Sequence, residues 1–235
     1  MYLLIPYNQR SDIVCGRFTL TVSEQTLQTY LNNTFNVSNK TAISHQPQYN
    51  IAPSQNILTV INDGKKDRVG YISWGFIPAW QHTKKNAIIN ARSETIDKLK
   101  SFKQAFKLKR CIILSDGFYE WHHITKKPFH FTLSNRKIFA FAGLWNSTIL
   151  EDGTTHYSCV IITTEANALL KDKHHRMPVI LSPNDYSTWL NPNQNNTKTL
   201  KTILKPYKSS DMSAYPVSSA VNNPSNNFID CIKPL

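Results

Sequence analysis

The chain has 235 residues, enough for one sizeable core, and 40% of them are hydrophobic, which is typical of a globular protein rather than a disordered one. Lys and Arg number 27 against 15 Asp and Glu, giving a net charge of +12. This excess favours a polyanionic partner such as nucleic acid, although a basic surface can also serve solubility alone. No run approaches the about 18 apolar residues of a membrane span, so we expect a soluble protein that does not contact the membrane.

The cysteines are scattered, without a C-x-x-C pair or the Cys and His spacing of a zinc site. Reduced thiols at such positions suit a cytoplasmic protein. The sequence therefore predicts no disulfide framework, no metal and no other cofactor. The four residues are Cys15, Cys111, Cys159 and Cys231.

From residue 23 onward the chain predicts a helix, a hairpin and a second helix. Ser23 is a suitable N-cap for an amphipathic helix through Leu31. The apolar runs 57–61 and 68–74 flank an Asp-Gly pair, which supplies the positive backbone angles of a tight hairpin turn. A helix over 96–106 then has lysines on one side and, on the other, Ile96, Leu99, Phe102 and Phe106.

The second half predicts more strands. Runs 130–133 and 138–145 flank an Asn-Arg pair and predict another hairpin, and 157–164 has the apolar character of a buried strand. A cap and a first-turn proline predict a short helix over 182–189. The asparagine-rich stretch 191–199 predicts a solvated loop.

Strands without regular crossover helices favour the α+β class. We expect a single domain over residues 15–235, built on a mainly antiparallel, barrel-like β-sheet with a few peripheral helices. We also expect a monomer.

Polar residues recur in short runs rich in aromatics, Gly or Pro: YNIAPSQ, WGFIPAW, NARSET, SDGFYEW and HHRMP. Glu120 lies between two aromatic residues, so it is either a desolvated carboxyl that trades protons near neutral pH or a surface residue of an alternating strand. His174 and His175 are either proton-transfer groups or part of a loop. Asn90 and Arg92 are either site residues or ordinary caps.

The order of these runs is more specific than any one of them. The chain resembles the SOS-response-associated peptidase family, also called abasic-site-processing proteins. The resemblance rests on eight runs in this order: CGRF at Cys15, YNIAP, WGFIP, NARSET, GFYEW, FAGLW, TTEAN and HHRMP. The resemblance extends from Cys15 to about Trp189. It implies a DNA-damage response protein that binds single-stranded DNA and links covalently to the aldehyde of an abasic site.

In this family the linking residue is an N-terminal cysteine. Its amine condenses with an aldehyde, and its thiol closes a five-membered thiazolidine ring on the same carbon; only an N-terminal cysteine offers both groups on one residue. An α-amine titrates near ~7.7–8.0 and a thiol near ~8.5, so both nucleophilic forms are accessible near neutral pH.

The resemblance also assigns roles to individual residues. Cys15 corresponds to the nucleophile, Asn90 to the amide that orients the N-terminus, and Glu120 and His174 to acid/base groups. Arg92 and Arg176 correspond to phosphate-binding arginines, a role suited to the guanidinium fork. An apolar wedge beside the bases is implied for Trp74, Phe76 and Pro78, with core packing as the alternative.

Fourteen residues precede Cys15 in this chain, whereas in the family the cysteine follows the initiator methionine. Two explanations are open. In the first, translation begins at Val14 from a GTG start codon, and residues 1–14 are a misassigned start of the gene. In the second, residues 1–14 are a leader that is cut off after Val14, either by the protein itself or by another protease. We favour the misassigned start. With residues 1–14 attached, Cys15 has no free amine and cannot form the ring.

Two other functions compete with covalent abasic-site sensing. An N-terminal-nucleophile cysteine peptidase or amidohydrolase would use Cys15, Glu120 and His174 to cleave amides. A basic single-strand-binding module would perform no chemistry at all. Positive charge with interleaved aromatics favours the two DNA-binding readings. A cytoplasmic protein associated with the nucleoid is expected from either.

Overall fold

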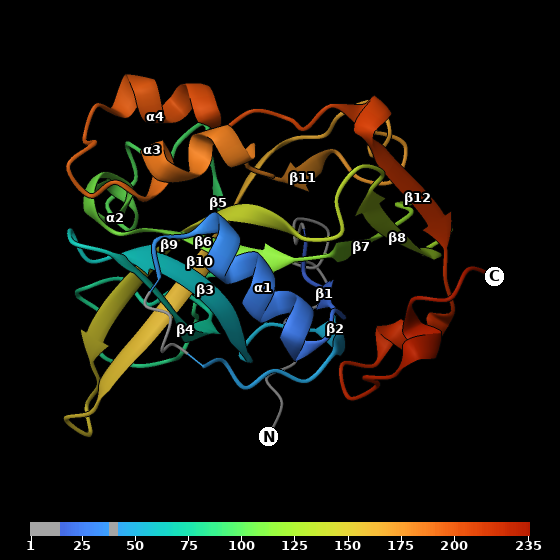
Figure 1. Cartoon of the computed structure of the whole chain (residues 1–235), viewed down its shortest axis with the longest axis horizontal. Coiled ribbons are helices and arrows are strands. Elements are labelled where there is room, and N and C mark those ends of the chain that lie inside the picture. Colours follow the sequence, from blue (N-terminus) through green and yellow to red (C-terminus); the bar gives the residue numbers. More distant parts are fainter. Residues whose placement is uncertain (1–14, 38–41) are drawn as a thin grey trace.

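The computed structural model of the chain describes residues 15–37 and 42–235, and its fold consists of two β-sheets with short helices around them (Figure 1). The predicted leader or misread start at 1–14 lies outside the described residues. The predicted α+β class is confirmed. Within the described residues, no helix is both long and apolar enough to cross a membrane.

The larger sheet closes on itself. Strand β9 pairs with both β6 and β10, so the order β10-β4-β3-β6-β9 returns to β10 and forms a barrel, with β5 and β11 attached to β10. All pairings among its described strands are antiparallel except β10 with β4 and β10 with β5. The strands are β3 Asn56–Asn62, β4 Asp67–Trp74, β5 Asn90–Arg92, β6 Arg110–Ser115, β9 Phe139–Ile149, β10 Thr155–Glu165 and β11 Arg176–Pro178.

The smaller sheet is antiparallel throughout, in the order β12-β8-β7-β1-β2. Its strands are β1 Phe18–Leu20, β2 Gln48–Ile51, β7 Gly117–Trp121, β8 Pro128–Leu133 and β12 Met212–Pro216. Strand β7 follows β6 after one residue, so the chain passes directly from the barrel into the smaller sheet. This continuity fixes how the two sheets face each other.

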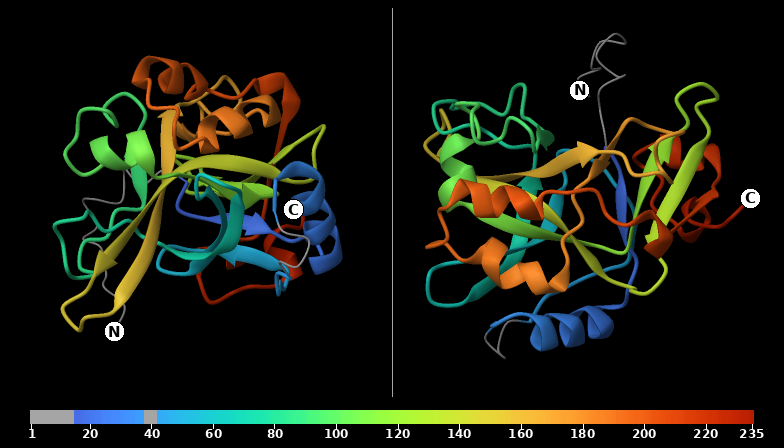
Figure 2. Two further views of the ribbon diagram at one scale, coloured as in Figure 1. Left: turned by 60° about the vertical axis from the view of Figure 1, so that its left-hand side comes forward. Right: turned by 90° about the horizontal axis from the view of Figure 1, so that it is seen from above.

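The helices lie on the outside of the two sheets, with α3 and α4 next to each other (Figure 2). Ser23 caps α1 as predicted, because its side chain accepts a hydrogen bond from the Thr26 N–H. The helical elements are α1 Glu24–Thr34, α2 Lys103–Leu108, η2 Pro183–Asp185, α3 Tyr186–Leu190, α4 Thr197–Ile203, η3 Ser209–Asp211, η4 Ser219–Asn222 and η5 Ile229–Cys231.

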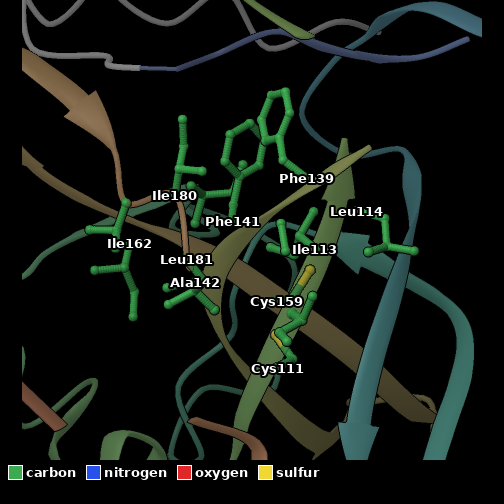
Figure 3. Close-up of a cluster of buried hydrophobic side chains, with 14 of the residues drawn as sticks. Cys111, Ile113, Leu114, Phe139, Phe141, Ala142, Cys159, Ile162, Ile180 and Leu181 are labelled. Carbon is green, nitrogen blue, oxygen red and sulfur yellow. The ribbon is translucent and has the colours of Figure 1, made fainter. Parts of the chain in front are cut away.

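The barrel interior and the smaller sheet share one core. Side chains of β6, β9 and β10 gather inside the barrel (Figure 3). The Phe141 ring of β9 also meets the rings of Phe18 and Phe118 edge-on, with centroids 5.7 and 6.0 Å apart. Rings at such distances and angles pack favourably beyond the area they bury. The inner face of β1 and β7 is thereby fixed against the barrel.

One predicted hairpin is wrong. Runs 130–133 and 138–145 lie in β8 and β9, which belong to different sheets: β8 pairs with β7 and β12, and β9 pairs with β6 and β10. The connection is a crossing between sheets, which short-range turn signals do not distinguish from a hairpin. The hairpin across Asp63-Gly64 is confirmed, since β3 and β4 pair from Asn62↔Asp67 onward.

Two further predictions need correction. The helix expected over 96–106 is regular only from Lys103, and the preceding residues form turns that bury Ile96 and Phe102 but leave Leu99 47% exposed. The solvated loop expected over 191–199 ends at Asn196, whose side chain caps α4. The first boundary is set by tertiary packing, and the second by the side-chain cap at Asn196.

A buried polar network crosses the outer side of the smaller sheet. The neutral His130 ring donates from Nε2 to Thr19 Oγ1 at 3.3 Å and accepts at Nδ1 from the Tyr215 hydroxyl at 2.9 Å. The Thr19 hydroxyl donates in turn to Asp116 at 2.6 Å. Burial lowers the pKa of His130 from 6.5 to about 4, because the charged imidazolium is poorly solvated there.

This pKa predicts a loss of stability in acid. Between pH 6.5 and 4 the unfolded chain binds a proton at His130 that the folded chain does not, so stability present above pH 6.5 is lost as the pH falls. In His130→Gln the contribution of this histidine should disappear. The free energy of unfolding should then decrease less steeply between pH 6.5 and 4, by up to ~1.4 kcal/mol per pH unit. Urea unfolding at several pH values measures this, with the exposed His82→Gln as control; parallel curves for parent and His130→Gln would contradict it.

Candidate active site

Cys15 and Glu120 are brought together by the pairing of β1 with β7. Phe18 faces Phe118 in the antiparallel register, and the Tyr119 N–H donates to the Arg17 carbonyl at 3.0 Å. This register brings the start of the described chain alongside the end of β7. The Cys15 backbone nitrogen donates to Glu120 Oε1 at 2.5 Å.

Alternation along β7 points Glu120 into the protein. Successive residues of a strand face opposite sides of the sheet, so Glu120 shares the inner face with Phe118, and Tyr119 and Trp121 share the outer one. Phe118 belongs to the main core, and the two aromatics belong to a smaller cluster outside the sheet. Glu120 is only 3% exposed, which excludes the surface-residue alternative.

The environment of Glu120 suits proton transfer near neutral pH. Burial raises the pKa of its carboxyl to about 8, against the opposing effect of backbone N–H donors at Cys15 and Trp121. A carboxyl with this pKa exchanges protons readily at physiological pH. Perturbed acids of this kind are frequent at functional sites.

Cys15 is fully buried and has an unusual backbone conformation. Its φ is 46°, in the left-handed region that costs a residue with a Cβ roughly 1–2 kcal/mol and that clusters at functional sites. Burial, and then the neighbouring Glu120 charge, raise the pKa of its thiol well above the usual value. The backbone nitrogen of the same residue is held against the Glu120 carboxyl.

Asn90 lies on β5, paired with Ile161 of β10. Its amide Oδ1 and Nδ2 are both buried, and neither has a hydrogen-bond partner among residues 15–37 and 42–235. A buried unpaired amide costs on the order of 1–3 kcal/mol, and such groups are uncommon in native proteins.

His174 lies just before β11. Its Nδ1 accepts a hydrogen bond from the Arg176 N–H at 3.1 Å, and its ring stacks on His175 with centroids 4.5 Å apart. In the neutral ring this acceptor role at Nδ1 places the proton on Nε2.

The two predicted phosphate-binding arginines differ in environment. They flank β10, where Arg92 pairs with Thr163 and Arg176 pairs with Glu165. Arg92 is exposed. The Arg176 fork is buried and donates to both carboxylate oxygens of Glu94 at 2.6 and 3.0 Å, and to the Thr163 carbonyl at 2.8 Å. Phosphate binding by either stays a prediction, and Arg176 would first have to leave Glu94.

The predicted wedge residues Trp74, Phe76 and Pro78 are all buried in the structure, with Trp74 at 0% and Phe76 at 1% exposure. The alternative of core packing therefore describes them, since apolar rings at the barrel end gain most by leaving water. The exposed aromatic of this run is Trp80, 48% exposed with the Lys100 ammonium 5.0 Å from its ring centroid. The sequence analysis did not select Trp80, because the residues of this run do not indicate which of its aromatic side chains are exposed.

Sequence reasoning also missed Arg17 and Asn50, which occur in the CGRF and YNIAP runs. Asn50 is 1% exposed, and the Arg17 guanidinium donates to its Oδ1 at 2.8 Å. Neither residue stands out by its local pattern, because the strand that contains Asn50 has the half-polar sequence QYNI and Arg17 precedes β1. Across the described part of the chain, no group of three or more His, Cys, Asp or Glu is arranged to hold a metal ion.

Comparison with known proteins shows the family to which the chain belongs. The model of the SOS response associated peptidase (SRAP) family matches residues 14–224. The chain is 42% identical over 226 residues to the abasic site processing protein YoqW of Bacillus subtilis, covering 94% of this chain and 99% of that protein. The abasic site processing protein YedK of Escherichia coli is 28% identical over 229 residues, covering 94% and 100%.

A solved structure of a protein from Bacteroides thetaiotaomicron has the same fold, with a TM-score of 0.80 and 25% identity over 94% of this chain and all of that one. Another, from Bordetella bronchiseptica, has a TM-score of 0.72 and 24% identity, covering 87% of this chain and 100% of that one. On the extent of the family match and the identity to its relatives, the chain belongs to the SOS response associated peptidase family.

Proposed function

We propose that the protein processes abasic sites by binding single-stranded DNA and linking Cys15 to the open-chain aldehyde as a thiazolidine. Its relatives are named abasic site processing proteins. The observation that carries the proposal is the 2.5 Å hydrogen bond from the Cys15 nitrogen to the buried Glu120 carboxyl. When Cys15 is the first residue, that nitrogen is an α-amine with an acid/base group already in contact.

The first step is condensation. As the sugar ring opens, His174 donates its Nε2 proton to the ring oxygen, and the C1′ hydroxyl proton returns to His174 through water. The protonated Glu120 carboxyl then donates to the aldehyde oxygen while the amine attacks C1′, and the resulting carboxylate takes the ammonium proton. The same carboxyl protonates the carbinolamine hydroxyl, which leaves as water, and takes back the iminium proton to leave the neutral imine. The Asn90 amide, unpaired among the described residues, holds the N-terminus in place.

The second step closes the ring. Cys15 Sγ adds to the imine carbon, and the thiol proton ends on the ring nitrogen, so the net change is the loss of one water. The raised pKa of the thiol fits this order, because a protonated thiol leaves the first attack to the amine. A thiolate is needed only once the electrophilic imine is formed.

The proposal requires the reacting form to begin at Cys15. Translation from Val14 and removal of the methionine would produce it, as would cleavage of residues 1–14 after Val14. Self-cleavage would use the same residues, with Cys15 Sγ attacking the Val14 carbonyl carbon and Glu120 protonating the nitrogen that leaves. Water would then release the Val14 carboxylate from the thioester.

The direct test is intact mass spectrometry after incubation with an abasic single-stranded oligonucleotide and denaturation. The form begun with Met in place of Val14, and shown to have lost that methionine, should give protein plus oligonucleotide less one water. Cys15→Ala in the same form should give no adduct that survives denaturation, because a bare imine hydrolyses. Absence of the adduct from the processed parent would refute the crosslinking function and leave peptidase or amidase activity to be assayed.

Proton transfer should set the rate. Glu120→Gln and His174→Ala in the Cys15-initiated form should each slow adduct formation by roughly 10²-fold while DNA is still retained. Rates come from quenched time courses at saturating DNA, with exposed Glu151→Gln as the matched control. Adduct rates equal to the parent in both variants would remove these residues from the mechanism.

Phosphate binding should appear in the salt dependence of affinity. Arg92→Ala should weaken binding to an oligonucleotide carrying a tetrahydrofuran in place of the abasic sugar, and should reduce the slope of log affinity against log salt by ~0.7 for one lost phosphate contact. Fluorescence anisotropy at several salt concentrations measures both. An unchanged slope, together with unchanged affinity, would show that Arg92 does not contact phosphate.

A further inference from the structure

The end of the chain lies across the outer face of the smaller sheet. After β12 pairs with β8, residues 217–235, here called the strap, form η4 and η5 beside β2 and β8 (Figure 1). The strap returns on itself, because Val217 bridges Pro234 and the Leu235 N–H donates to the Pro216 carbonyl at 3.1 Å. It therefore forms a closed loop on this face.

Two side chains of the sheet hold the strap by its backbone. Asn50 Nδ2 donates to the carbonyls of Val221, Asn223 and Asn226 at 3.1, 3.0 and 2.8 Å. Arg17 donates from Nη1 to the Val221 carbonyl at 2.6 Å and from Nη2 to the Asn222 carbonyl at 3.1 Å. A buried amide and a half-buried guanidinium with this many acceptors are costly to separate from them.

Two aromatic residues of β7 add further contacts. Trp121 Nε1 donates to Asn222 Oδ1 at 2.7 Å, and the Tyr119 hydroxyl lies 3.3 Å from the Cys231 carbonyl as well as 2.6 Å from the Tyr49 carbonyl. The Arg17 guanidinium also lies over the Trp121 ring, 6.0 Å from its centroid. Arg17 is thus occupied by protein groups on several sides.

Arg17 and the two aromatic residues lie in the segments that carry Cys15 and Glu120, whereas Asn50 lies on β2. Arg17 is two residues from Cys15, and Tyr119 and Trp121 flank Glu120. Successive strand residues face opposite sides of the sheet. The strap therefore contacts the outer face of the same segments that, on the inner face, place Glu120 against the Cys15 nitrogen. A small change in that backbone changes the distance that the proton must cross, and misplacement of about 1 Å can cost ~10²-fold in rate.

We infer that Trp121 is a positioning residue which, through its hydrogen bond to Asn222 of the strap, sets the contact between the Cys15 amine and Glu120. Arg17 and Asn50 hold the strap where Trp121 meets it. This inference rests on the proposed crosslinking function. It gives the C-terminal segment a role in the chemistry although it contributes no reacting group.

The test uses Trp121→Phe, Asn222→Ala and the double variant in the full-length Cys15-initiated form. Each single change removes the indole to amide hydrogen bond while leaving the Arg17 and Asn50 contacts to the strap backbone. Adduct rates are measured at saturating abasic oligonucleotide from pH 5 to 9, and affinity is measured separately with the tetrahydrofuran oligonucleotide, which has no aldehyde. We expect each single variant to be roughly 10-fold slower, with affinity within about twofold.

The double variant should be no slower than the slower single one, because both remove the same contact. The pH midpoint of the rate should move down in all three, since water admitted beside Glu120 relieves the burial that raises its pKa. Asn227→Ala is the matched control: it loses a strap contact to the Tyr49 N–H on β2 and should keep the parent rate and midpoint.

Parent rates and midpoints in Trp121→Phe and Asn222→Ala would overturn the inference, as would an equal slowing in Asn227→Ala. Either result would make the strap a structural cover only. If the parent itself forms no adduct, the proposed function has failed, and that result is separate from any failure of the strap.

Discussion

The hydrogen bond between the Cys15 nitrogen and the buried Glu120 carboxyl is the contact on which the site depends. A carboxyl in an apolar interior is costly as an anion, which is why its pKa rises to about 8. A carboxyl with this pKa exchanges protons readily near neutral pH. The burial of this side chain by β7 therefore affects both the stability of the fold and the pKa of the carboxyl.

The smaller sheet makes this depth possible by having two covered faces. Its inner face packs on the barrel through Phe18, Phe118 and Phe141, while its outer face carries the His130 network and the strap. An antiparallel sheet often leaves one face to water. Here the C-terminal segment covers that face, so β1, which follows Cys15, and β7, which carries Glu120, are held from both sides.

Local features of the fold were predictable because their causes are local. A cap at Ser23 and a turn at Asp63-Gly64 depend on residues a few positions apart. The boundary between β8 and β9 was not predictable in this way, because a strand's partner is chosen by the whole sheet and not by the turn before it. The burial of Trp74 and Phe76 likewise depends on distant rings, because Trp74 packs on Phe18 and Phe76 packs on Phe102.

By itself, the sequence determined the α+β class and, through the order of its motifs, the family and the set of candidate residues. Only the tertiary structure decided how those residues are used. Glu120 meets Cys15 across 105 positions, Arg176 pairs with Glu94 across 82, and Asn50 holds Val221 across 171. Burial and pairing at such separations depend on how sheets and strap pack, so residue type alone leaves open whether a polar group reacts, binds or holds the fold together.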